Sequence, residues 1–90
     1  MFNKTYTIRH DYYFCGREYQ PTYHTGTINE LIAAFEYPLT IARGYGFRCN
    51  YQPKTIKALL KTLTACFGFI HSCEIDTIER VSLVDDQKIK

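Results

Sequence analysis

The chain has 90 residues and a formal net charge of +2. Ninety residues suffice for one domain with one hydrophobic core, and they exclude a second domain of ordinary size. A net charge near zero argues against a protein that is held to nucleic acid or to an anionic membrane by bulk charge alone. We therefore expect a single domain over 1–84, followed by a polar C-terminal tail over 85–90.

The sequence contains no apolar run that approaches the roughly 20 residues of a membrane-spanning helix. The N-terminus is polar from Asn3 onward, unlike a secretory signal peptide. We expect a cytoplasmic protein without a membrane partner, in the host cytoplasm if a phage encodes it. The four cysteines are then expected to be reduced and to act as small apolar side chains: Cys15, Cys49, Cys66 and Cys73.

The N-terminal segment is typical of a β-hairpin. Residues 4–14 alternate between apolar and polar side chains, which is the two-residue period of a strand with one buried face. Residues 15–17 supply the turn, and residues 18–24 form the return strand. Pro21 cannot donate a hydrogen bond to a neighbouring strand, so the return strand is expected at the edge of the sheet.

The first helix is expected directly after the hairpin. Thr27 and Glu30 have the spacing of a capping box, and the apolar residues that follow recur at helical spacing. Pro38 is expected to end this helix, because the residue before a proline disfavours helical geometry. Residues 39–50 alternate like a strand that two glycines weaken. A helical extension to Ala42, followed by a glycine-rich loop, is the alternative.

The second helix is expected to begin at Pro53 and to end at Gly68, because these residue types favour those two positions. Residues 73–84 alternate again and are expected to form the last strand, with a bulge over 76–79. The predicted class is α+β. The hairpin, the last strand and an additional strand at 39–49 form a small antiparallel sheet, with two helices packed on one face.

The tyrosine-rich hairpin is the first hypothesis for a binding site. Six aromatic residues lie within 6–23, more than one face of a small sheet can bury. Tyr13 has the opposite parity from the aromatic residues beside it and is expected to face away from the core. Exposed tyrosine beside arginine is typical of protein interfaces. The expected partner-binding residues are Arg9, Tyr13, Arg17, Tyr19 and Tyr23, and the hairpin edge could also pair with a second copy of the chain.

Residues 43–48, RGYGFR, partly match a sequence signature of nucleic-acid-binding domains. The first five fit the start of the RNA-recognition-motif signature, whose aromatic residues stack on bases. That signature continues with an aliphatic residue and ends on an aromatic residue, whereas this chain has Arg48 and Asn50 at those places. The predicted order of strands and helices also differs from that of the motif. We therefore interpret the stretch as a turn or an edge strand in which Tyr45 and Phe47 pack inward, while Arg43 and Arg48 stay in water.

A basic face is the second hypothesis for a binding site. The second helix carries lysines at a spacing that aligns them along one ridge, which could follow a phosphate backbone. Lysines are also the usual covering of a solvated helix face. The residues of this nucleic-acid-binding alternative are Arg43, Tyr45, Arg48, Lys54, Lys57 and Lys61.

The sequence shows no arrangement typical of an enzyme: it has no phosphate-binding loop, no Ser-His-Asp pattern and no paired acid motif. Cys66, His71 and Cys73 are close in sequence, but their C-x4-H-x-C spacing lacks the Cys-x2-Cys unit of a structural zinc site. We therefore expect no catalytic residue, no cofactor and no metal.

The expected function is that of a small non-enzymatic module that binds a larger protein or complex and occludes part of its surface. In size and composition the chain is similar to small phage-encoded inhibitors of host defence, including anti-CRISPR proteins. That likeness is one of composition and carries no shared motif.

Overall fold

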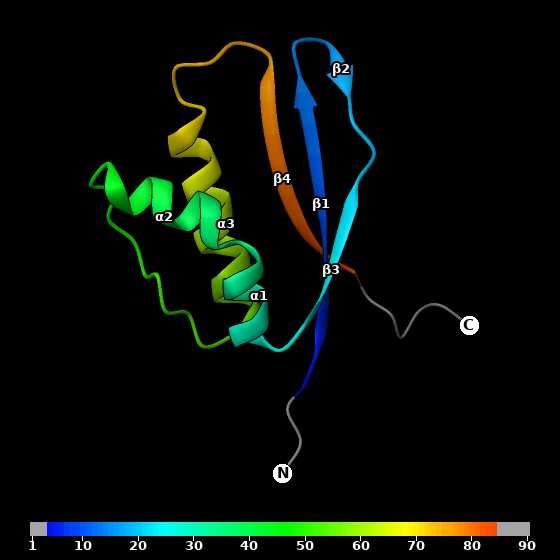
Figure 1. Ribbon diagram of the computed structural model, residues 1–90, viewed down its shortest axis with the longest axis vertical. Coiled ribbons are helices and arrows are strands. Elements are labelled where there is room, and N and C mark those ends of the chain that lie inside the picture. The colour runs from blue at the N-terminus through cyan, green and yellow to red at the C-terminus, as the bar shows by residue number, and fades with distance from the viewer. Residues whose placement is uncertain (1–3, 85–90) are drawn as a thin grey trace.

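Residues 4–84, the part of the chain that this computed structural model describes, form an antiparallel sheet with three helices on one side of it (Figure 1). The strands are β1 (Tyr6–Phe14), β2 (Arg17–Glu18), β3 (Thr22–Gly26) and β4 (Thr77–Val84). The helices are α1 (Ile28–Ala34), α2 (Glu36–Gly44) and α3 (Ile56–Ile70). The predicted α+β class is confirmed, with three helices in place of two. The predicted tail over 85–90 lies outside the described residues.

Strand β1 is the centre of the sheet. It pairs antiparallel with β4 on one edge and with β3 and β2 on the other. β2 and β3 are one return strand that is interrupted at residues 19–21, so the predicted continuous strand over 18–24 is wrong. The interruption contains Pro21, which lacks the N–H that a continuous ladder requires. The expectation that this strand lies at the edge is confirmed among the described strands.

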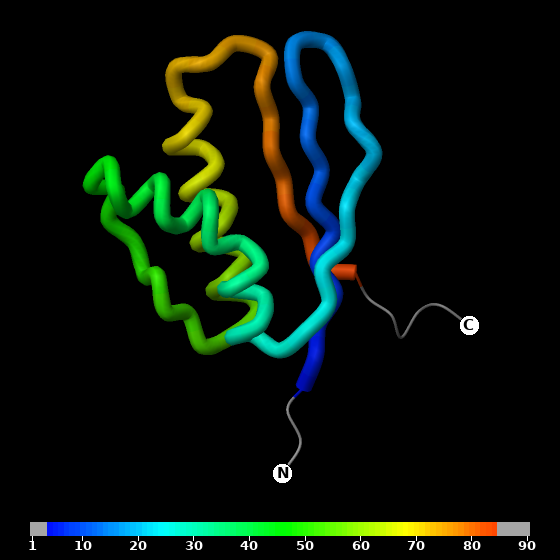
Figure 2. The backbone as a smooth tube through the Cα atoms, in the orientation of Figure 1, coloured from blue at the N-terminus to red at the C-terminus, as the bar shows by residue number. Residues whose placement is uncertain are grey.

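The turn between β1 and β2 is a two-residue hairpin turn at Cys15 and Gly16. Both residues have positive φ, 51° and 80°, as in a type I′ turn, whose backbone matches the twist of the flanking strands. The Cys15 side chain makes this conformation costly. The Cys15 N–H donates to the carbonyl oxygen of Asp76 at 2.8 Å, which ties the turn to the connection between α3 and β4 at the same end of the molecule (Figure 2).

The prediction that Pro38 ends the first helix is wrong. Helix α1 ends at Ala34, Phe35 leaves helical geometry, and α2 then begins at Glu36. Pro38 lies in the first turn of α2, where its missing N–H would have had no partner within the helix. The chain therefore forms two short helices with a bend between them.

The strand predicted at 39–49 does not form. Helix α2 covers the first half of that segment, and residues 45–55 are an irregular connection. Phe35, Leu39 and Ala42 are all buried, at the spacing i, i+4, i+7 of one helix face. Burial of this face outweighs the two-residue alternation, and the helical alternative is the one that the structure adopts.

Helix α3 begins directly after Thr55 and not at Pro53. The Thr55 side chain accepts a hydrogen bond from the Ala58 N–H at 3.1 Å, which caps the first turn. The helix continues past Gly68, so the predicted end is also wrong. A glycine ends a helix when it takes a left-handed conformation, and Gly68 keeps helical geometry.

The core lies between the helices and the side of the sheet that faces them. Its buried apolar side chains come from β1 and from all three helices: Ile8, Leu31, Phe35, Leu39, Ala42, Leu59, Leu63, Cys66 and Phe67. Strand β4 begins at Thr77, and the bulge predicted over 76–79 is absent, because the pairing of β4 with β1 runs without interruption. Ile78 therefore points to the side of the sheet away from the helices.

Two glycine substitutions are expected to change stability in opposite directions. A Cβ added at Gly26 would lie 2.7 Å from Glu30 Oε1 and 2.9 Å from Glu30 Cβ. Glu30 would have to leave the capping box, where its carboxylate accepts the Thr27 N–H at 2.8 Å. Gly26→Ala should therefore cost about 1 kcal/mol, the typical loss for a helix cap.

A Cβ added at Gly68 meets no atom within 4 Å, and the position is inside α3. Gly68→Ala should stabilise the protein by about 0.5–1 kcal/mol through helix propensity. Urea denaturation followed by circular dichroism measures both variants. A loss of stability in Gly68→Ala would contradict the placement of α3 past this residue.

Candidate functional site

Within residues 4–84, one side of the sheet carries no helix, and this side is named the open face. Successive residues of a strand point to opposite sides. Because Ile8 is buried against the helices, Arg9, Asp11 and Tyr13 of β1 lie on the open face. Tyr23 of β3 stands opposite Arg9 and joins them there. The parity of Tyr13 in the sequence predicted this side correctly.

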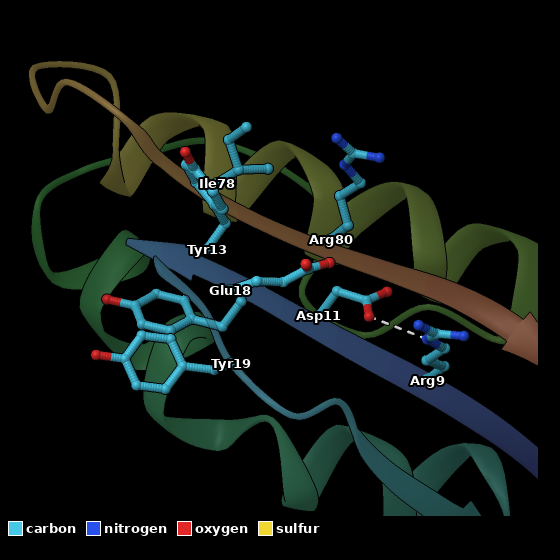
Figure 3. A pocket seen from close by; sticks show the side chains of 8 residues that line it. Arg9, Asp11, Tyr13, Glu18, Tyr19, Ile78 and Arg80 are labelled. Atoms are coloured by element: carbon cyan, nitrogen blue, oxygen red, sulfur yellow. Dashed lines mark hydrogen bonds and ion pairs between the residues drawn. The ribbon is translucent and has the colours of Figure 1, made fainter. Parts of the chain in front are cut away.

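A hollow of about 420 Å³ lies on the open face, with its labelled side chains in front of the strands and the helices behind them (Figure 3). It is lined by two arginines and two carboxylates, together with aromatic and aliphatic side chains. The charged residues are Arg9, Asp11, Glu18 and Arg80. Tyr12, Tyr13, Tyr19 and Ile78 supply apolar surface. The hollow therefore combines apolar surface with charges of both signs.

The charges of the hollow are arranged in opposite pairs. Arg9 Nε donates to Asp11 Oδ1 at 2.9 Å, and Asp11 stands opposite Arg80 on β4. The hydrogen bond to Asp11, and then its charge, raise the pKa of Arg9 above the usual value, so this guanidinium stays charged. The Arg9 and Asp11 side chains are both more than a third exposed, which makes the pair worth little for stability. These charges remain available to a partner.

Four of the five predicted partner-binding residues come together on or beside this hollow. Arg9, Tyr13 and Tyr19 line it, and Tyr23, which is 56% exposed, stands next to Arg9. Arg17 does not belong to the group. It pairs with Phe14, whose parity places both side chains on the opposite side of the sheet.

Five residues of the hollow were missed by sequence reasoning: Asp11, Tyr12, Glu18, Ile78 and Arg80. Ile78 carried a signal, because its parity differs from that of the other apolar residues of the last strand. That difference predicts a bulge, whereas in the structure it marks an apolar side chain on the open face. The pairing of β4 with β1, which brings Arg80 to Asp11, has no local sign in the sequence.

The residues of the nucleic-acid alternative all lie in the helical layer, in α2, α3 and the connection between them: Arg43, Tyr45, Arg48, Lys54, Lys57 and Lys61. The Arg43 guanidinium lies over the ring of Tyr51, 5.3 Å from its centroid, in a cation–π contact. Tyr45 is 79% exposed, so the expectation that it packs inward is wrong. Phe47 does pack inward, against Phe69 at 4.7 Å between ring centroids.

A second polar site lies between the sheet and the helices, and sequence reasoning missed it. Glu79 of β4 is its centre: Oε2 lies 2.7 Å from His10 Nε2, and Oε1 lies 2.6 Å from His71 Nε2. His71 Nδ1 lies 2.6 Å from Glu74 Oε1. These hydrogen bonds join β1, β4 and the C-terminal end of α3. The signal in the sequence was a polar residue at an inward-facing position of two strands, His10 and Glu79.

Burial and hydrogen bonding act in opposite directions on this cluster. Burial lowers the pKa of His71, but its hydrogen bonds to Glu79 and Glu74 raise it more, so the net shift is upward. Burial raises the pKa of Glu79, but its hydrogen bonds to His10 and His71 lower it more, so the net shift is downward. The cluster therefore favours an imidazolium at His71 paired with a carboxylate at Glu79.

The cysteines and histidines that are close in sequence are not brought together. His71 bonds to carboxylates, Cys73 is exposed, and Cys66 Sγ lies 3.9 Å from Cys49 Sγ. Burial raises the pKa of Cys66 to about 12, so this thiol stays protonated and unreactive. Within residues 4–84, no group of three or more His, Cys, Asp or Glu side chains could hold a metal ion.

Comparison with protein-family models, with curated proteins and with solved structures finds no match, so function is inferred from the sites themselves. Among the helices of the described segment, none has the length and apolarity needed to cross a membrane.

Proposed function

We propose that the protein is a non-enzymatic module that binds another protein through the open face of its sheet. The observation that carries this proposal is the gathering of Tyr13, Tyr19 and Tyr23 with Arg9 and Arg80 around one hollow. Tyrosine and arginine are enriched in protein interfaces and among the residues that dominate binding energy. Tyrosine offers a large contact area with only two side-chain torsions to order on binding.

The hollow fits a partner that inserts an apolar or aromatic side chain among polar groups. Tyr13 and Ile78 provide the apolar contact, and the surrounding arginines and carboxylates can select a partner with complementary charges. Charges of both signs suit the mixed surface of a protein better than the uniformly negative backbone of a nucleic acid. These features support a protein partner.

A more specific version of the proposal names the kind of partner and the cellular compartment. The module would act in the cytoplasm by covering a surface of a larger protein or complex, as a phage-type inhibitor of a host defence complex does. The size and composition of the chain support this comparison with anti-CRISPR proteins. β2 and β3 pair only with β1 among the described strands, so a second copy of the chain would add at their outer edge.

Tyr13→Ala is expected to weaken partner binding at least about tenfold, the effect of losing roughly 1.4 kcal/mol at an interface hot spot. The substitution is on the open face, so the free energy of unfolding should change by less than about 1 kcal/mol. Lys57→Ala, in the helical layer, is the matched control. Affinity capture from cell extract, quantified by mass spectrometry, compares the wild type with both variants. Calorimetry with the purified partner then gives the dissociation constants.

A partner that the wild type and Lys57→Ala retain and Tyr13→Ala loses supports the proposal. A steep fall in melting temperature for Tyr13→Ala would show instead that this residue belongs to the core. The nucleic-acid alternative is compared by fluorescence anisotropy of labelled RNA and DNA. Micromolar binding that falls steeply with salt would contradict the proposal. It would indicate instead that Arg48 and the lysines of α3 bind nucleic acid.

A further inference from the structure

A cleft of about 600 Å³ lies on the helix-facing side of the sheet, beside the Glu79 cluster. Small-molecule sites have volumes of roughly 300–1,000 Å³, with mostly apolar walls and a few polar groups that orient the ligand. The apolar wall of this cleft consists of Phe35, Pro38, Ile41 and Ile70. None of these four residues lines the hollow of the open face, and Tyr12 is the one residue that lines both.

Four polar side chains line this cleft without a hydrogen-bond partner among residues 4–84, and the imidazole of His24 and the phenol of Tyr12 are two of them; the others are Thr22 and Tyr37. Neighbouring polar groups already have hydrogen-bond partners: both oxygens of Glu79 bond to His10 and His71. No side-chain nitrogen or oxygen of the described part is both fully buried and unpaired, so the polar atoms of His24 and Tyr12 are not fully buried. They are free to bond to a ligand.

The His24 ring is held in one orientation by two other rings. Phe35 packs against it edge to face, with centroids 4.8 Å apart and planes at 61°. His10 lies on the same side of the sheet, with its centroid 6.3 Å from that of His24. The backbone of His24 is fixed by pairing with Ile8 of β1. An imidazole that is already ordered loses little side-chain freedom when it binds a ligand.

The free polar groups of the cleft are neutral at physiological pH. Burial, and then the charge of His10, lower the pKa of His24, so its ring has one donor and one acceptor nitrogen. Burial, and then the carboxylate of Glu79, raise the pKa of Tyr12, so it remains a phenol. A charged ligand would lose hydration here without gaining a free counter-charge. The cleft is therefore suited to a neutral ligand.

We infer that this cleft binds a small neutral aromatic molecule that carries a hydroxyl group or a ring nitrogen. The ring of the ligand lies against Phe35, Ile41 and Ile70, and its polar group bonds to His24. Aromatic rings favour the edge and face contacts that Phe35 provides. The hydrogen bond to His24 distinguishes such a ligand from a purely apolar one.

The test is a titration of the isotopically labelled protein with p-cresol, followed by two-dimensional 1H–15N NMR. We expect saturable shifts in the amides of β3 and α2, with a Kd on the order of 1 mM or lower. Toluene has the same ring without the hydroxyl and should bind about tenfold more weakly, as expected for one lost hydrogen bond.

Two variants sharpen the result. His24→Leu keeps apolar volume and should bind p-cresol about tenfold more weakly while leaving toluene binding unchanged. Lys57→Ala changes an exposed side chain of α3 that does not line the cleft and should bind both ligands as the wild type does. Equal affinity of the wild type for p-cresol and toluene would overturn the role of His24, even if His24→Leu does not fold. Shifts that do not saturate, or that lie away from the residues that line the cleft, would overturn the site itself.

Discussion

Leu63→Ala is expected to lower the free energy of unfolding by about 2–5 kcal/mol, the range for truncating a buried leucine. Leu63 is fully buried at the centre of α3 and packs in the core with Ile8 and Phe67. The loss combines the transfer of the removed carbons to water with the cavity that they leave. Domains are stable by only about 5–15 kcal/mol, so this variant should approach the limit of folding.

Leu60→Ala is the matched control for this experiment. Leu60 is the same residue type in the same helix, but it is only half-buried at the edge of the core. Its truncation should cost clearly less, below about 2 kcal/mol, because water replaces part of the lost contact. Urea denaturation at one temperature gives both values. A larger loss for Leu60→Ala than for Leu63→Ala would show that α3 is rotated about its axis.

Glu79→Ala is expected to cost about 3 kcal/mol, at the lower end of the range for breaking a buried ion pair. The carboxylate is only 17% exposed and accepts hydrogen bonds from two imidazoles, His10 and His71. Its removal leaves both rings without their acceptor in a site that water reaches poorly. Glu74→Ala is the control, because Glu74 also bonds to His71 but is 50% exposed and should cost less than about 1 kcal/mol.

The same cluster gives a pH dependence whose sign follows from the pKa shifts. The pKa of His71 lies above its usual 6.5, so its contribution is complete below 6.5 and is lost as pH rises through the native value. The pKa of Glu79 lies below its usual 4.5, so its contribution is complete above 4.5 and is lost as pH falls through the native value. Both contributions are complete between those two usual values.

His71→Gln isolates the contribution of His71 to the pH dependence of stability. The lowered pKa of His24 acts in the opposite direction over the same range, but it is present in both proteins and cancels in their difference. The stability difference between the wild type and His71→Gln should therefore be larger near pH 5.5 than near pH 8.5, as linkage requires. A difference that is independent of pH would mean that folding does not shift the pKa of His71.

Local pattern predicted β1 and the sides that its residues face, but it also predicted a strand over 39–49 that does not form. The alternation that places Tyr13 away from the core depends only on the two-residue period, and so does the inward position of Ile8. Pro38 shows where such rules fail, because the same residue type that ends a helix can also begin one. Whether Pro38 ends one helix or begins another depended on burial of Leu39 and Ala42 against α3, which is a tertiary effect.

The sites were predictable only in part, for a related reason. The tyrosines of the open face are close together in the sequence, so they could be grouped before the fold was known. His10 and Glu79 are 69 positions apart, and only the pairing of β1 with β4 brings them within hydrogen-bond distance. Single-sequence patterns carry no information about such a pair beyond the polarity of each member.

The place of β1 at the centre of the sheet has a consequence for how the chain folds. One edge of β1 is completed by the nearby β2 and β3, whereas the other edge requires β4, whose residues are made last among those described. Pairings between distant segments close large loops and slow folding. During synthesis, the unpaired edge of β1 remains exposed until residue 84 has left the ribosome. A chain cut before β4 should therefore be prone to aggregation through this edge.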